Sequence, residues 1–335
     1  MTNFKKYFSA HLKANIKPFL YILIVVLALT FLIGYEAQPT QRYDYAARRS
    51  VQDYNSTLFI PITVLCILTY VLPVMEFSFF KKRIDLDCAY SLPISRRAMG
   101  TVHYLVGLIM LCGAFTASYL VNFMLLLSRG PGWFNFTPML AHYFLSLLLG
   151  VVMYAVMVFV FNEANTKGDG IWFMILYTFI FFLLVWAFSN LTGKWYDGSP
   201  GLSWGVIGRL TTNYQYLVEL DSTNKADFWQ TPENVGWFVF WTAAGIASAV
   251  GFFFTFGKRR MEKTEEISDS YFGFRVLIPL YAVSGMIAFP VSDVIIFWVI
   301  IELLALLGYT IYRRGFHYKK SDIAILCLLL LFLFK

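Results

Sequence analysis

Charged side chains are scarce in this 335-residue sequence: Asp, Glu, Lys and Arg make up only 14% of it. Soluble domains carry about 25% charged residues, whereas here 59% of the residues are hydrophobic and 19% are aromatic. This deficit excludes an ordinary soluble domain and indicates an integral membrane protein. The net charge of +7 therefore has to be interpreted by where the basic residues lie, and we expect no nucleic-acid partner.

The sequence also lacks the short motifs of disulfide frameworks, metal sites and nucleotide-binding enzymes. Its four cysteines and four histidines are scattered, with neither Cys-x-x-Cys nor His-x-x-x-His spacing. A Gly-x-x-x-x-Gly-Lys-Ser/Thr phosphate loop is absent as well, and no long apolar run contains a pair of aspartates. We therefore predict that this chain is not an enzyme and has no catalytic residue, no metal ligand and no cofactor of its own.

Long apolar runs recur along the chain and predict membrane-spanning helices. A hydrocarbon core about 30 Å thick requires about 20 helical residues. Eight runs reach or approach this length, namely 19–34, 58–77, 103–127, 139–161, 171–190, 236–257, 276–290 and 294–312. A ninth run, 323–334, is too short to cross unaided, and we expect it to stop inside the bilayer. The predicted fold class is an all-α integral membrane protein with about eight transmembrane helices and a short ninth apolar segment.

The first 17 residues predict a separate helix that precedes the first span. Their apolar side chains fall at helical spacing, with the lysines largely off this stripe: Phe4, Tyr7, Phe8, Leu12, Ile16 and Phe19. The pattern is typical of an amphipathic helix lying in the membrane interface. We expect this interfacial helix to end near Pro18, because proline lacks the backbone N–H that a helix interior uses. The alternative is a frayed basic tail.

The segment KKRIDLDCAYSLPISRR, residues 81–97, fixes the predicted orientation. It holds five basic residues, and one Lys or Arg at the centre of a span costs about 2.5–3.5 kcal/mol, so the segment lies outside the bilayer. If successive connections between spans alternate between the two sides of the membrane, the segments on the same side as the N-terminus hold most of the Lys and Arg residues. The positive-inside rule then predicts a cytoplasmic N-terminus and a cytoplasmic 81–97 loop. We expect a multi-pass protein of the plasma membrane.

Within this loop, the pattern predicts a short helix, a break and re-entry into the membrane. Leu86, Ala89 and Tyr90 share one helical face. Pro93 should stop the helix just before itself, and Ser95 can cap the next span. Such a loop could dock a cytosolic partner, or it could be an ordinary basic connector.

The stretch KKRIDLDCAYSLPISRRAMGTVHYLVG resembles the loop between the second and third spans of type-2 ABC exporter permeases. In many of these proteins, a lysine, an acidic pair, Ser-Leu-Pro and then an arginine precede the third helix. A second stretch, FGKRRMEKTEEIS, is similar to a basic-then-Glu pattern that often follows their sixth span. The resemblance implies a six-span permease domain over 1–265, including the N-terminal amphipathic helix, and additional C-terminal transmembrane helices over 266–335.

In that family the loop is a coupling helix that docks on an ATPase subunit. Carried over to this sequence, the resemblance implies a contact formed by Asp85, Asp87, Tyr90, Ser91, Leu92, Pro93 and Arg96. We expect the apolar part of this contact to be a patch of Leu86, Tyr90 and Leu92. The implied partners are ABC ATPase subunits, which would bind ATP and Mg²⁺, and a second permease subunit, identical or related.

The predicted function is the permease subunit of an ATP-driven exporter that moves a hydrophobic or amphiphilic substrate outward. The alternative is a non-transporting sensor or immunity subunit whose ligand binds the outer loop, 191–235, where we expect a helix over 202–220. Two carboxylates, Glu76 and Glu302, mark a candidate intramembrane polar site, because ionisable groups within spans are costly. For Glu302, hydrogen bonding between packed helices is favoured over a polar path.

Overall fold

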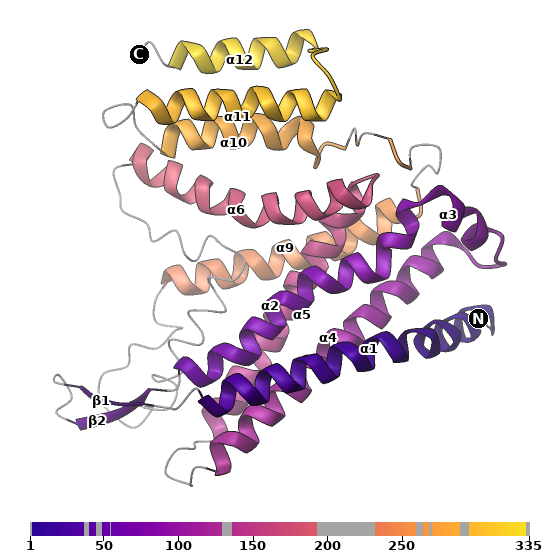
Figure 1. The fold of residues 1–335 in the computed structure, drawn as a ribbon, viewed down its shortest axis with the longest axis vertical. Helices are drawn as coiled ribbons and strands as arrows, with labels where there is room; N and C mark the ends of the chain where they lie inside the picture. The colour runs from indigo at the N-terminus through magenta and orange to yellow at the C-terminus, as the bar shows by residue number, and fades with distance from the viewer. Residues whose placement is uncertain are drawn as a thin grey trace. The chain divides into compact units, whose positions relative to one another are not determined.

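Helices dominate the computed structural model (Figure 1). It describes residues 2–36, 40–44, 49–53, 55–128, 136–192, 232–258, 264–266, 268, 270–288 and 295–332. The elements are α1 (Thr2–Glu36), β1 (Thr40–Asp44), β2 (Arg49–Asp53), α2 (Asn55–Phe77), the 3-10 helix η1 (Ser78–Lys81), α3 (Arg83–Tyr90), α4 (Arg96–Ser128), α5 (Phe136–Glu163), α6 (Lys167–Thr192), α9 (Pro232–Phe256), α10 (Phe274–Ala288), α11 (Ile295–Arg313) and α12 (Lys320–Phe332).

Six of the described helices are long and apolar enough to cross a membrane: α1, α2, α4, α5, α6 and α9. These confirm the helical, multi-pass character that the apolar runs predicted. The predicted seventh and eighth spans also coincide with helices, but α10 has only 15 residues, so the total of eight stays a prediction. The predicted outer-loop helix, 202–220, lies outside the described residues.

The predicted break at Pro18 is wrong, because α1 continues through this residue as one helix of 35 residues. A proline inside a helix costs about 3 kcal/mol or more, since it removes one hydrogen bond and crowds the preceding turn. Packing along α4 opposes this cost, and Thr30 and Ser118 share a buried hydrogen bond of 2.8 Å between the two helices. A second unpredicted feature is the antiparallel hairpin β1–β2, in which Thr40 pairs with Asp53.

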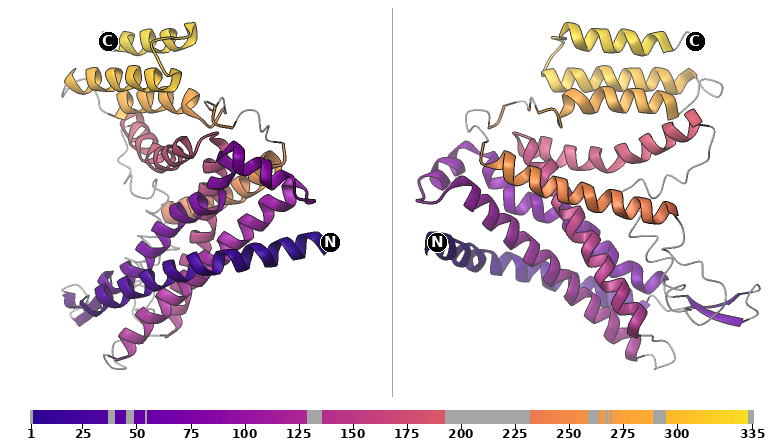
Figure 2. Two further views of the ribbon diagram at one scale, coloured as in Figure 1. Left: turned by 45° about the vertical axis from the view of Figure 1, so that its right-hand side comes forward. Right: turned by 180° about the vertical axis from the view of Figure 1, so that it is seen from behind.

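The helices cluster into two compact units. The first contains α1, α2, α4, α9 and α5 up to Phe159, and the second contains η1, α6, α10, α11, α12 and the segment that begins at Val160. This division differs from the predicted boundary at residue 265, because α6 packs against α10 and belongs with it to the second unit. In the second unit, Tyr281 on α10 donates a hydrogen bond to the carbonyl of Leu176 on α6, and the pairing of α10 with α11 is visible in both views of Figure 2.

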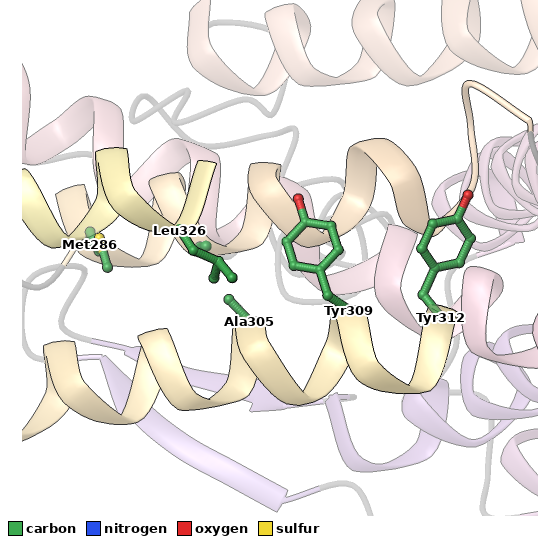
Figure 3. Close-up of a cluster of buried hydrophobic side chains, with 6 residues drawn as sticks. Met286, Ala305, Tyr309, Tyr312 and Leu326 are labelled. Atoms are coloured by element: carbon green, nitrogen blue, oxygen red, sulfur yellow. The ribbon is translucent and has the colours of Figure 1, made fainter. Parts of the chain in front are cut away.

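The core of the second unit includes a cluster of aliphatic and aromatic side chains between α10, α11 and α12 (Figure 3). Its members are Ala282, Met286, Ala305, Tyr309, Tyr312 and Leu326. The three α11 residues follow helical spacing and therefore face one way. Glu302 lies one turn before Ala305 on this packing face.

Candidate functional site

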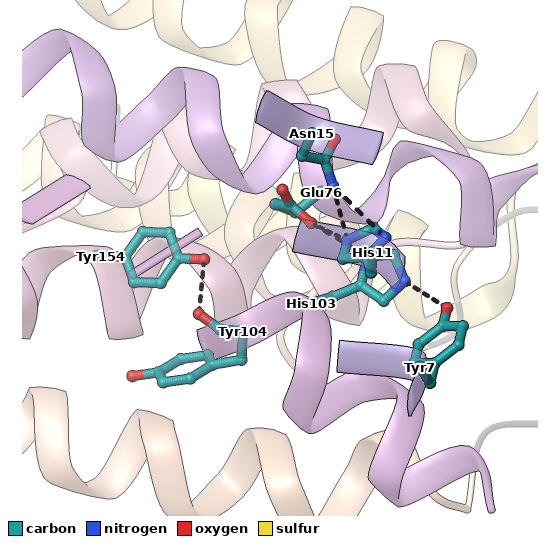
Figure 4. Close-up of polar contacts among 7 residues, drawn as sticks. All are labelled: Tyr7, His11, Asn15, Glu76, His103, Tyr104 and Tyr154. Atoms are coloured by element: carbon teal, nitrogen blue, oxygen red, sulfur yellow. Dashed lines mark hydrogen bonds and ion pairs between the residues drawn. The ribbon is translucent and has the colours of Figure 1, made fainter. Parts of the chain in front are cut away.

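Three helices of the first unit bring two histidines to one carboxylate. His11 on α1 lies with Nε2 2.9 Å from Oε2 of Glu76 on α2, and His103 on α4 lies with Nδ1 3.1 Å from the same oxygen. The two imidazole rings are 3.9 Å apart between centroids. Glu76 and His103 are each only 4% exposed, whereas the His11 side chain retains 17% of its exposure. The cluster is therefore buried, and His11 is its most exposed member; Figure 4 shows the contacts of both histidines with Glu76 and with α1.

Two further side chains of α1 hold the histidine rings. The Tyr7 hydroxyl is 3.1 Å from Nε2 of His103, and Asn15 Nδ2 is 2.9 Å from Nε2 of His11. Tyr7, His11 and Asn15 are spaced four residues apart, which places them on one face of a helix. One stripe of α1 thus supplies a ligand-type side chain and two side chains that orient imidazoles.

A glycine on α4 makes room for this cluster. Gly107 lies one turn after His103, and a Cβ atom there would approach the hydroxyl of Tyr154 to 2.1 Å and Cγ of Glu76 to 3.2 Å. Neither neighbour tolerates such an approach, since Tyr154 on α5 is fully buried and its hydroxyl donates to the carbonyl of Tyr104 at 3.4 Å. The absence of a side chain at Gly107 therefore lets α2 and α5 pack against the same turn of α4.

Among the described residues, histidines are the only ion-pair partners of Glu76. One nitrogen from each histidine and one oxygen from Glu76 all lie within 4.8 Å of one another. Chemically, this set can share a proton or hold a metal ion; that the chain has no metal ligand stays a prediction. Glu76 itself was predicted as a candidate polar site, whereas His11 and His103 were not.

Sequence patterns could not reveal this constellation because its members are distant in the chain. His11 and Glu76 are 65 residues apart, and Glu76 and His103 are 27 apart, so no motif spacing links them. The available signal was weaker: Glu76 and His103 each sit at the end of an apolar run, whereas His11 lies in the amphipathic segment before the first run. Ionisable groups in such places are costly unless they find partners.

The predicted coupling loop has the predicted backbone. Helix α3 ends at Tyr90, the chain is non-helical up to Ser95, and α4 begins at Arg96. Ser95 caps α4, because its Oγ accepts a hydrogen bond of 3.3 Å from the Ala98 amide. From the first turn of α1, Asn3 donates a hydrogen bond of 3.3 Å to the carbonyl of Pro93.

The exposure of the side chains in this loop differs in part from what the predicted partner contact requires. Leu86 is buried, at 3% exposure, whereas Ile84 is 80% exposed and Leu92 is 41% exposed. The expectation that Leu86 anchors a partner is therefore wrong, because its side chain is already covered within the chain. Asp85 is half-buried; the exposed members of the predicted set are Asp87, Ser91, Leu92, Pro93 and Arg96. The Tyr90 side chain lies outside the described residues.

Lys81, at the start of this segment, has a role that the sequence did not indicate. It is only 2% exposed, and its ammonium group donates to the carbonyls of Phe161 at 2.9 Å, Asn162 at 3.3 Å and Ala164 at 2.5 Å. These carbonyls lie at the C-terminal end of α5, where a helix leaves acceptors unpaired and favours a cation. Lys81 thus caps α5.

Glu302, the other predicted polar residue, belongs to the second unit, whereas Glu76 belongs to the first. Oε2 of Glu302 is buried and has no hydrogen-bond partner among the described residues. Its position on the α11 packing face agrees with the packing role favoured from sequence, but the expected hydrogen bond to a neighbouring helix is not present for this oxygen.

Comparisons of the chain with protein-family models, with curated proteins and with solved structures gave no match. Function therefore has to be argued from the residues of this chain.

Proposed function

We propose that the chain is the membrane-spanning permease subunit of an ATP-driven exporter of hydrophobic or amphiphilic molecules. The observation that carries this proposal is the 81–97 connection: a short helix between two long apolar helices, ended before a proline and followed by a capped span. Its resemblance to the coupling loop of type-2 ABC exporter permeases supports the same assignment. In this proposal the N-terminus and the loop face the cytoplasm, and the protein lies in the plasma membrane.

ATP hydrolysis would be supplied by separate ATPase subunits that dock on this loop, and a second permease subunit, identical or related, would complete the transporter. The exposed apolar side chains Ile84 and Leu92 are the anchors we assign to the ATPase contact, with exposed Asp87 helping to fix its register. The hydrogen bond from Asn3 to Pro93 joins α1 to the same loop, so a push on the loop would also reach the first helix.

The test is copurification of the ATPase from native membranes in mild detergent. Truncating an interface anchor typically costs about 2 kcal/mol or more of binding, and about 1.4 kcal/mol is tenfold. Ile84→Ala with Leu92→Ala should therefore weaken association with the ATPase at least about tenfold. Phe316→Ala is the matched control, because Phe316 is 81% exposed but lies outside the loop.

Two readouts accompany the copurification. Asp87→Lys should increase the salt sensitivity of any remaining association, since charged contacts steer and register an interface. Permease-dependent ATP hydrolysis should fall with binding in the double alanine variant. Normal copurification and hydrolysis in that variant would reduce the loop to a connector and favour the alternative, a non-transporting sensor or immunity subunit.

A further inference from the structure

We propose that His11, Glu76 and His103 form a binding site for a first-row divalent metal ion of the Zn²⁺ type. The ligands would be Nε2 of His11, Oε2 of Glu76 and Nδ1 of His103. This site is independent of the transport proposal, because it rests only on side chains within the first unit.

The spacing of the ligand atoms fits such an ion. Zinc binds histidine nitrogen and carboxylate oxygen at about 2.0–2.2 Å with tetrahedral geometry, so neighbouring ligand atoms are about 3.3 Å apart. Here the two nitrogen–oxygen distances are 2.9 and 3.1 Å, and all three ligand atoms lie within 4.8 Å. The two histidine–carboxylate distances would have to lengthen by only a few tenths of an ångström for a metal ion to enter the shared position.

The surroundings also match what metal-bound histidines require. A ligating imidazole usually has its other nitrogen held by a hydrogen bond, which fixes the ring and its tautomer. With Nδ1 of His103 on the metal, Nε2–H would donate to the Tyr7 hydroxyl, 3.1 Å away. For His11, the Asn15 side-chain amide lies beside the ring, with Nδ2 3.4 Å from Nδ1. Because Nδ1–H of a metal-bound His11 needs an acceptor, Asn15 would serve as its outer partner only with the amide turned so that Oδ1 faces this nitrogen.

The hydrogen bonds of the metal-free cluster leave one conflict. Nε2 of His11 is 2.9 Å from both the Glu76 carboxylate and Asn15 Nδ2. A proton on this nitrogen satisfies the carboxylate but confronts the amide N–H, whereas without a proton the nitrogen faces the carboxylate with a lone pair. A cation between Nε2 and Oε2 removes the repulsion between the two acceptors.

The chemistry of the ligand set selects the metal class. Two imidazoles and one carboxylate suit Zn²⁺ and its neighbours, while Mg²⁺ and Ca²⁺ prefer oxygen ligands throughout. Three protein ligands leave a fourth position for water, as in open zinc sites, and the partly exposed His11 provides the entry side. Because the ligands come from α1, α2 and α4, a bound ion would tie the first helix to the two spans that flank the 81–97 loop.

The experiment is a titration of the purified full-length chain in detergent with Co²⁺, followed by competition with Zn²⁺. The protein carries a tag without histidine and is stripped of metal beforehand. We expect one Co²⁺ per chain, with the visible absorption of four-coordinate cobalt, displaced by Zn²⁺. His103→Ala should weaken binding at least about 100-fold, since even loss of an outer partner costs about 10–100-fold.

Two further variants keep the outcome decisive. Tyr7→Phe retains all three ligands and should weaken binding about tenfold, which covers the case in which His103→Ala fails to fold. His142→Ala is the control, because it removes a fully buried histidine of α5 that contacts Tyr119 instead of Glu76, and it should bind Co²⁺ like the unaltered chain. Absence of saturable binding, or equal binding by the unaltered chain, His103→Ala and Tyr7→Phe, would overturn the site.

Discussion

The second unit holds Arg313 and Asp322 as a bidentate ion pair at the short connection between α11 and α12, whereas the first unit holds Glu76 between two histidines. The arginine donates to the aspartate from Nε at 3.0 Å and from Nη2 at 3.2 Å, and Asp322 also accepts from the Lys319 amide at 3.1 Å. Arginine stays charged at any ordinary pH, so this pair is fixed.

Around Glu76, by contrast, both ion-pair partners are histidines, a residue type that carries no permanent charge and that, in the site we propose, would bind a metal ion. Lys81 in the second unit resembles the Arg313–Asp322 pair, because its ammonium group is held by backbone carbonyls, which are permanent dipoles. The difference teaches that burial of charge alone does not mark a functional site. A buried charge with permanent partners stabilises the fold, while one with titratable partners can change its occupancy.

The largest effect is expected at Lys81. Lys81→Met keeps the length of the side chain but leaves buried carbonyls at the end of α5 without their donor, and an unsatisfied buried group costs about 1–3 kcal/mol. We expect a loss of about 3 kcal/mol in the free energy of unfolding, measured by denaturation in detergent. The neighbouring exposed residue supplies the control, Lys82→Met, and equal stability of the two variants would refute the capping role.

A smaller loss is expected when the fixed ion pair is broken. Asp322→Asn leaves the Arg313 guanidinium partly buried without its carboxylate, and hydrogen bonds to charged groups are worth about 1.5–3 kcal/mol. We expect the unfolding free energy to fall by about 2 kcal/mol. Adding Arg313→Met should recover part of this loss, because the unpaired cation is then gone. Strictly additive effects would show that the two side chains are not coupled.

The smallest effect is expected at Glu76 in metal-free protein. Glu76→Gln keeps an acceptor and adds a donor, and neutral imidazoles can exchange tautomers to match them. We expect the stability to change by less than about 1 kcal/mol. A loss as large as that of Asp322→Asn would indicate that a histidine carries a fixed positive charge, and the contrast between the two units would disappear.

The apolar runs predicted most of the helices, because a stretch of about 20 apolar residues in a chain this hydrophobic is best accommodated as a membrane-spanning helix. Local signals also succeeded at the loop: α3 ends before Pro93 and Ser95 caps α4, since both effects act within a few residues. Pro18 shows the limit of such signals. Its local preference is overridden by packing of α1 along α4, which the sequence of α1 does not contain.

The candidate site could be predicted only in part, for a related reason. Glu76 stood out as an ionisable residue at the end of a span, but its partners depend on which helix faces lie together. The Lys81 contacts and the burial of Leu86 depend on tertiary packing in the same way. A membrane-spanning helix is apolar on all its faces, so the periodicity of its sequence says little about which face packs against other helices and which faces lipid.

The unbroken course of α1 has a mechanical consequence. At 35 residues and 1.5 Å per residue, the helix is about 52 Å long, well beyond a hydrocarbon core of about 30 Å. Pro18 leaves the carbonyl four residues earlier without its usual donor, so bending is easiest at that turn. Tyr7, His11 and Asn15 lie on the half of α1 before Pro18, and the Thr30–Ser118 contact lies on the half after it. A bend confined to the turn at Pro18 would change the angle between the two halves of α1, while the contacts around His11 and the Thr30–Ser118 hydrogen bond stay intact.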